Sequence, residues 1–149
     1  MPEFRIDRRC PLTPQQAWRR VTDWPRHAAQ VPLTGTTVLT PPPTRTGTRF
    51  VARTGIGRLA FDDPMEVTEW RPPTAEDPHG RCHLLKTGTF LTGWAEIEVR
   101  PHGSGTHVVW REDLRVTRLP RLFDPLTARA GRAVFGLALR RLLSSPSGV

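Results

Sequence analysis

The sequence predicts an α+β fold in which a curved antiparallel sheet of about seven strands wraps around one long C-terminal helix, with two short helices after the first strand. Three observations predict this fold. Apolar and polar side chains alternate at the start of the chain, a period of two continues between residues 33 and 114 with hairpin-length links, and the segment 125–143 has a helical period. Short links between successive strands predict antiparallel pairing of neighbours along the chain.

The first strand is expected over residues 3–10, where apolar side chains alternate with charged ones. A helix is expected next, because Thr13 is a favourable N-cap residue and Pro14 suits the first helical position. Gln16 follows Thr13 at the spacing of a capping box. A second short helix is expected over residues 26–30.

The other strands are predicted from alternation and from the turn residues that separate them. They are expected over residues 36–40, 49–56, 59–70, 81–87, 90–100 and 106–116. Gly55 and Gly57 predict a hairpin turn. Asp63 and Pro64 predict a bulge or a strand start, because proline has no N–H to donate to a neighbouring strand.

The final helix is expected over residues 125–143, and its apolar side chains gather in one sector. This sector holds Leu126, Ala130, Ala133, Val134 and Leu137. Arg129, Arg132 and Arg140 lie beside or opposite it, which predicts a solvated face. One domain is expected over residues 1–143, and residues 144–149 are expected to form a frayed tail.

The chain is strongly basic, with 22 basic and 14 acidic residues in 149, a net charge of +8 and a pI near 11.4. Lys86 is the only lysine, so the other basic residues are arginines, which suit fixed contacts to anions. A genomic codon bias would produce the same excess without any function. Sixteen prolines and no tyrosine favour that explanation and a bacterial, high-GC coding background.

Composition also excludes several classes of protein. No segment approaches the roughly 20 apolar residues of a membrane span, and the N-terminus has no apolar signal core, so a cytoplasmic location is expected. Cys10 and Cys82 are too few for a disulfide framework or a thiolate zinc site. The five histidines show no metal-binding spacing, and no glycine-rich segment has the pattern of a phosphate loop. No metal and no cofactor are therefore expected.

Several short segments carry a resemblance to a known family. They are Ala17-Trp18, Asp23-Trp24, Gly47-Thr48-Arg49-Phe50, Glu69-Trp70-Arg71-Pro72-Pro73, and Gly105-Thr106 before Val108-Val109-Trp110. With the order of elements, these segments resemble the helix-grip fold of the START and birch-pollen-allergen superfamily, and within it the SRPBCC proteins of the polyketide cyclase/dehydrase and lipid-transport group. The resemblance covers residues 3–143. It implies a cavity between sheet and long helix for a hydrophobic small molecule.

Two charged residues share a strand face with apolar ones. Glu112 lies on the same parity as Trp110, and Lys86 lies on the same parity as Cys82 and Leu84. If both are buried, they need each other or a ligand, because an unpaired buried charge is strongly unfavourable. They would then orient a polar ligand group or transfer protons. The alternative is that one or both lie at a strand end and reach water.

The residues expected to line a ligand cavity are mainly large and apolar, as in most small-molecule sites. They are Trp24, Phe50, Met65, Leu84, Lys86, Phe90, Trp94, Ile97, Trp110, Glu112, Ala130, Val134 and Leu137. Aromatic residues at this spacing also occur as plain core. A bulge would exchange the two faces of a strand and change this set.

Three functions compete at this point. The first is binding of a hydrophobic, lipid-like or polyketide-like molecule. The second is a cyclase or dehydratase reaction in the same cavity, with Glu112 and Lys86 as acid and base candidates. The third is a basic accessory protein that binds anionic lipid or nucleic acid through its surface. We expect a small-molecule partner, no nucleic acid and no stable membrane insertion, and an exposed edge strand would support a homodimer.

Overall fold

The computed structural model of the protein describes residues 3–31, 33–117 and 120–144. Seven strands form one antiparallel sheet in the order β1-β7-β6-β5-β4-β3-β2. They are β1 (Glu3–Cys10), β2 (Thr34–Val38), β3 (Arg49–Thr54), β4 (Phe61–Arg71), β5 (Gly80–Lys86), β6 (Leu91–His102) and β7 (Gly105–Val116).

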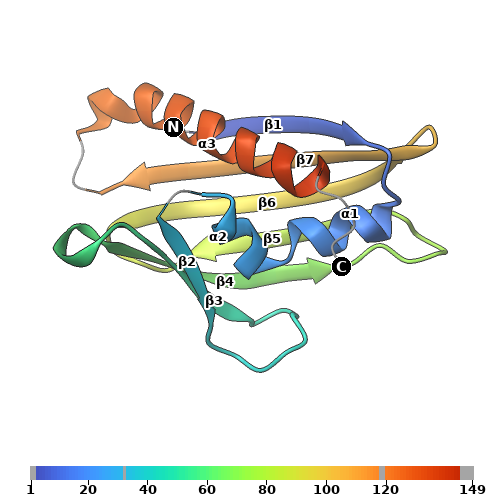
Figure 1. The fold of residues 1–149 in the computed structure, drawn as a ribbon, viewed down its shortest axis with the longest axis horizontal. Coiled ribbons are helices and arrows are strands. Elements are labelled where there is room, and N and C mark those ends of the chain that lie inside the picture. Colours follow the sequence, from blue (N-terminus) through green and yellow to red (C-terminus); the bar gives the residue numbers. More distant parts are fainter. Residues whose placement is uncertain (1–2, 32, 118–119, 145–149) are drawn as a thin grey trace.

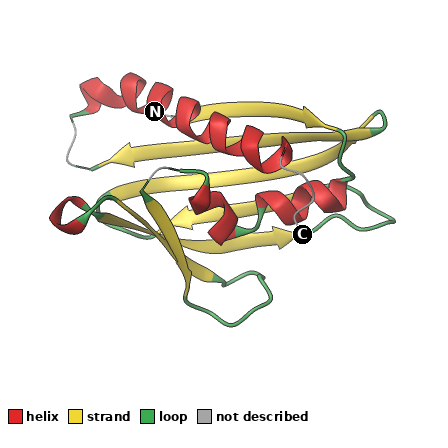
Figure 2. Ribbon diagram, in the orientation of Figure 1, coloured by secondary structure: helices red, strands yellow, loops and turns green. Residues whose placement is uncertain are grey.

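Three α-helices lie on the same face of this sheet (Figures 1 and 2). They are α1 (Pro14–Val21), α2 (Trp24–Ala29) and α3 (Asp124–Ser144), and two short 3-10 helices, η1 (Gly57–Leu59) and η2 (Arg121–Phe123), complete the fold. The long α3 runs over β1 and β7, whereas α1 packs on β6 and β7 and α2 on β2. The predicted fold class and element order are confirmed.

Side-chain caps fix the starts of the two short helices. The Thr13 hydroxyl accepts a hydrogen bond from the Gln16 backbone N–H at 3.2 Å, and the Gln16 side chain accepts one from the Thr13 N–H at 3.0 Å. This is the predicted capping box. Asp23 caps α2 by accepting from the Arg26 N–H at 3.2 Å, so this helix begins at Trp24, two residues before the predicted start.

The irregularity in β4 lies at Thr68 and not at Asp63–Pro64, where the sequence predicted it. The register between β4 and β5 shifts between Val67 and Glu69. The extra residue keeps both Val67 and Trp70 on the inner face, although their spacing would place them on opposite faces of a regular strand. Pro64 is accommodated opposite Val51 of β3, and its carbonyl accepts from the Thr87 N–H at 2.9 Å.

The face that α3 turns to the sheet differs from the predicted one. Its buried residues are Gly131, Gly136, Ala138, Leu139, Leu142 and Leu143. Three members of the predicted apolar sector, Leu126, Val134 and Leu137, are 58%, 42% and 47% exposed. The helix is therefore rotated about its axis from the predicted orientation, with Gly131 facing β1. Only glycine fits so close to β1 at this position, because a Cβ on Gly131 would lie 2.7 Å from the Phe4 ring. A helix rolled onto its glycines approaches β1 more closely than one that faces it with leucine.

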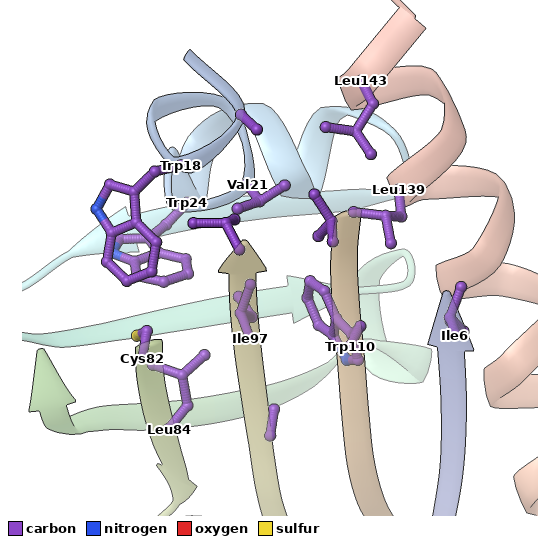
Figure 3. Close-up of a cluster of buried hydrophobic side chains, with 14 of the residues drawn as sticks. Ile6, Trp18, Val21, Trp24, Cys82, Leu84, Ile97, Trp110, Leu139 and Leu143 are labelled. Carbon is purple, nitrogen blue, oxygen red and sulfur yellow. The ribbon is translucent and has the colours of Figure 1, made fainter. Parts of the chain in front are cut away.

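The packed core lies under α1 and the second half of α3. Trp18 and Val21 of α1 and Leu139 of α3 meet Ile97 of β6 there (Figure 3). Cys82 belongs to the same cluster, and burial raises the pKa of its thiol to about 12.

The last helix, α3, ends close to where the sequence predicted. Ser144 completes α3, one residue beyond the expected helix end, and the rest of the expected tail lies outside the described residues. None of the helices within the described ranges is long and apolar enough to cross a membrane.

Gly93 of β6 is a position where only glycine fits. Its φ is +126°, and a Cβ would overlap the Asp113 carbonyl oxygen of β7. We expect Gly93→Ala to lower the free energy of unfolding by about 3 kcal/mol or more, since backbone strain and steric overlap add. Gly35→Ala is the control, because a Cβ on Gly35 meets nothing within 4 Å. Urea denaturation measures both, and equal stability of the two variants would contradict the close approach.

Candidate functional site

A cavity of about 560 Å³ lies between the sheet, α2 and the first half of α3. Its wall is mostly apolar and aromatic. The apolar and hydroxyl residues that line it are Trp24, Ala28, Val31, Thr34, Thr36, Phe50, Ala52, Thr54, Phe61, Met65, Leu84, Phe90, Leu91, Ala95, Trp110, Leu114, Val116, Thr127, Ala130, Gly131, Val134 and Phe135. Four ionisable side chains also reach it: His27, Asp63, Lys86 and Glu112.

Stacked rings connect the helices to the sheet across the cavity wall. Trp24 of α2 stacks on Phe50 of β3 with ring centroids 4.6 Å apart. Trp110 of β7 contacts His27 of α2 at 4.8 Å and Phe135 of α3 at 5.7 Å. These rings lie between the helices and the sheet and form one part of the cavity wall.

Lys86, Asp63 and Glu112 form a buried ion cluster on the sheet side of the cavity wall. The Lys86 ammonium donates to Asp63 Oδ2 at 2.6 Å and lies 3.3 Å from Glu112 Oε1. The three residues are 6%, 8% and 1% exposed. The alternative in which Lys86 or Glu112 reaches water at a strand end is therefore wrong.

Small residues on β6 make this cluster possible. Lys86 of β5 pairs with Gly93 of β6, and Glu112 of β7 pairs with Ala95 of β6. With only a hydrogen and a methyl group between them on the inner face, the lysine reaches across β6 to the glutamate. Asp63 joins from β4, two residues before Met65, which pairs with Lys86.

The ion cluster contains two carboxyl groups and one ammonium group. Burial opposes the charge of Lys86, but Glu112 and Asp63 outweigh it and raise the lysine pKa. Burial also raises the pKa of Glu112, and the Asp63 charge adds to this effect, although Lys86 acts against it. Asp63 Oδ1 and Glu112 Oε2 have no hydrogen-bond partner among the described residues.

The His27 ring is a neutral polar group in the same cavity. Its Nε2 lies 2.7 Å from the Val21 carbonyl oxygen, so Nε2 carries the proton and donates it, which leaves Nδ1 as an acceptor. Burial lowers the pKa of His27 from 6.5 to about 4. The ring is uncharged near neutral pH.

Most of the residues expected at a ligand site lie around this cavity. They are Trp24, Phe50, Met65, Leu84, Lys86, Phe90, Trp110, Glu112, Ala130 and Val134. The wall also contains residues that the sequence analysis missed, above all Asp63, His27, Phe61 and Phe135. Asp63 shares its parity with Met65, which was the available signal. No periodic pattern distinguishes His27 in its short helix.

Three expected residues do not line the cavity, and their positions require a correction. Trp94 points to the outer face of the sheet, where it stacks on His83 at 5.7 Å under the Arg111 guanidinium. Ile97 points inward but is fully buried in the packed core. Leu137 lies on the outer side of α3 beside Arg8 and Arg132, because the helix is rotated from its predicted orientation.

A family model described as "Polyketide cyclase / dehydrase and lipid transport" matches residues 1–144. The chain belongs to this family. No curated protein sequence matches it. Within the described ranges, no group of three or more His, Cys, Asp or Glu side chains is arranged to hold a metal ion.

The fold of this polyketide cyclase/dehydrase family member is similar to solved structures, among them one of the START superfamily. A START superfamily protein from Mycobacterium smegmatis is 11% identical, with a TM-score of 0.72 over 95% of this chain and 96% of its own. The protein TTHA0849 from Thermus thermophilus is 16% identical, with a TM-score of 0.67 over 95% and 94%. The Zhui aromatase/cyclase from Streptomyces sp. R1128 is 12% identical, with a TM-score of 0.60 over 99% and 98%. At these identities, the likeness shows the fold alone.

Loss of the lysine should destabilise the protein strongly. Lys86→Met leaves two buried carboxyl groups without their counter-ion, and we expect a loss of about 3–5 kcal/mol in the free energy of unfolding. Adding Glu112→Gln to Lys86→Met should recover part of this loss, because one uncompensated charge is removed. Arg53→Met is the control, since it breaks an exposed pair with Asp62 at 3.5 Å and should cost about 1 kcal/mol or less. Strictly additive effects of the two cluster substitutions in urea denaturation would contradict the coupling.

His27 should make stability depend on pH. Because its pKa falls from 6.5 to about 4 on folding, the unfolded chain binds more protons between these values. Stability is therefore complete above pH 6.5 and falls as the pH is lowered toward 4, by up to about 3 kcal/mol from this residue. We expect His27→Gln, which keeps a donor for Val21, to show a correspondingly smaller loss between pH 7 and pH 4 in urea denaturation. Parallel pH profiles would show that the ring is not held neutral by burial.

Proposed function

We propose that this protein binds an apolar small molecule of lipid-like or polyketide-like chemistry in the cavity between the sheet and α3. The single observation that carries the proposal is an apolar and aromatic cavity of about 560 Å³ in which a few polar groups converge. Small-molecule sites typically have volumes of about 300–1,000 Å³ and this composition. Membership of a family described by polyketide cyclisation and lipid transport supports the same class of ligand.

The ion cluster gives such a ligand one orientation. An apolar body would lie against the stacked rings of Trp24, Phe50 and Trp110, while one polar end meets Asp63 and Glu112. Polar groups of this kind fix how a ligand sits, because a misplaced ligand leaves them buried and unpaired.

A cyclase or dehydratase reaction is the second candidate, and one observation favours it. Burial raises the pKa of Glu112, so this carboxyl group is poised to donate a proton to a carbonyl or departing hydroxyl oxygen. Asp63 Oδ1 is the adjacent acceptor. In this reading, Glu112→Gln abolishes turnover of a poly-β-keto substrate while binding persists; turnover that survives the substitution would remove Glu112 as the acid.

Titration with N-phenyl-1-naphthylamine, a neutral aromatic probe whose fluorescence rises in apolar surroundings, tests binding directly. We expect saturable binding to the wild-type protein and a loss of at least about tenfold in affinity for Ala130→Trp, since a large ring at this lining position fills part of the cavity. Ala133→Trp is the matched control on the same helix, because Ala133 lines a separate groove between α3 and β1, together with Arg8 and Arg132. No saturable binding, or equal effects of the two substitutions, would contradict a ligand site in this cavity. Native mass spectrometry of the protein purified from its own host would reveal the mass of a retained ligand.

A further inference from the structure

We propose that the cavity selects an apolar molecule that ends in a positively charged amine, whose ammonium group is bound by Asp63 Oδ1 and Glu112 Oε2. This inference rests on the proposed function and names the chemistry of the ligand's polar end. It follows from the charge of the ion cluster, the unpaired oxygens and the aromatic walls.

The cluster has one carboxyl group more than it has cations. Lys86 neutralises one negative charge, so a second charge in the ionised cluster has no counter-ion. The other titratable group that lines the cavity in the described part of the chain is His27, which stays uncharged above about pH 4. Neither β6 nor α3 adds a charge, because β6 presents Gly93 and Ala95 beside the cluster and the α3 lining residues are uncharged.

Lys86 itself is poorly placed to bind an anionic ligand. Its ammonium group already contacts Asp63 Oδ2, Glu112 Oε1 and the Met65 sulfur at 2.6, 3.3 and 3.8 Å. A ligand carboxylate at this ammonium would also meet the two carboxyl groups that already contact it. The cavity is therefore locally acidic inside a chain whose net charge is +8.

The two unpaired oxygens are acceptors that need donors. Glu112 and Asp63 are both buried, and each leaves one carboxyl oxygen without a partner in the described structure. The Trp110 indole N–H also favours the charged form of Glu112, but no hydrogen bond of normal distance and angle joins them. An ammonium group carries three N–H donors and one positive charge, so it supplies both the donors and the charge that this cluster lacks.

Aromatic rings next to the cluster provide a second attraction for a cation. Trp110 precedes Glu112 on the inner face of β7 and stacks with Phe135 of α3. Phe61 and Phe90 pair at 4.8 Å elsewhere in the wall. The negative faces of such rings attract ammonium groups, and the attraction is strongest where water is excluded.

Amine binding should favour the charged form of Glu112. Without ligand, burial favours the protonated carboxyl group; a bound ammonium favours the carboxylate. An alkyl ammonium remains charged up to about pH 10. Binding of the amine therefore strengthens as the pH rises, because more of the Glu112 carboxyl group is then charged.

Displacement of N-phenyl-1-naphthylamine by octylamine, octan-1-ol and octanoate tests the inference on the unmodified protein at pH 7. We expect octylamine to compete at least about tenfold better than octan-1-ol, and octanoate to be the weakest. Repeating the displacement at several pH values should show that octylamine competes better as the pH rises, with no such change for octan-1-ol.

Two isosteric variants locate the effect. Glu112→Gln should remove most of the preference for octylamine over octan-1-ol. Asp62→Asn should retain the preference, because Asp62 neighbours the cluster in sequence but lies at the surface beside Arg53. Like Glu112→Gln, Asp62→Asn replaces one carboxyl group by an amide of the same shape. Thermal unfolding followed by circular dichroism verifies that both variants are folded.

The ways in which the experiment can fail are distinguishable. If the naphthylamine probe binds and octan-1-ol or octanoate competes as well as octylamine, the inference is wrong and the proposed function stands. A preference for octylamine that survives Glu112→Gln overturns the role of the cluster. If the probe itself does not bind to the wild-type protein, the proposed function fails.

Discussion

The contact of Lys86 with Asp63 and Glu112 joins three strands of the sheet through charges that are withdrawn from water. Such a cluster is stable only while every member keeps its partner, because each buried ion carries a desolvation penalty of several kcal/mol. The small residues Gly93 and Ala95 of β6 allow the lysine side chain to reach from β5 to Glu112 of β7. The cluster therefore depends on the sheet register, and a shift by one residue would turn its side chains to the opposite face.

The cavity follows from uneven packing of the helices on the sheet. At one end, α1 and the second half of α3 cover the strands with Trp18, Val21 and Leu139, and the core is filled. Toward the start of α3, small residues such as Ala130 and Gly131 face the sheet, and stacked rings lie between α2 and the sheet. The core is thus filled under α1 and the second half of α3, and the cavity remains between the sheet, α2 and the first half of α3.

Several arginines form ion pairs with carboxylates on the outer face of the sheet. Arg81 pairs there with Glu69, Glu96 and Glu98 at 3.5, 3.0 and 3.9 Å. Arg111 lies 3.6 and 3.7 Å from Glu3 and Glu96. Arginine and carboxylate side chains are therefore interspersed on this face, and the exposed pairs among them contribute little stability individually. The one lysine, in contrast, is buried.

The sequence by itself determined the order of the elements, the two short helices and the inner faces of β5 and β7. These features are local: a capping box fixes the start of α1, and strict alternation places Lys86 and Glu112 on the cavity side. The rotation of α3 and the face of each β4 residue were decided only by the tertiary structure. Helix rotation depends on which residues allow the closest approach, so Gly131 against Phe4 prevailed over the larger apolar sector. The bulge at Thr68 comes from pairing with β5, a neighbour that periodicity within β4 does not reveal. The third member of the ion cluster, Asp63, likewise became evident only when pairing brought β4 beside β5, because a charge cluster is formed between strands and not within one.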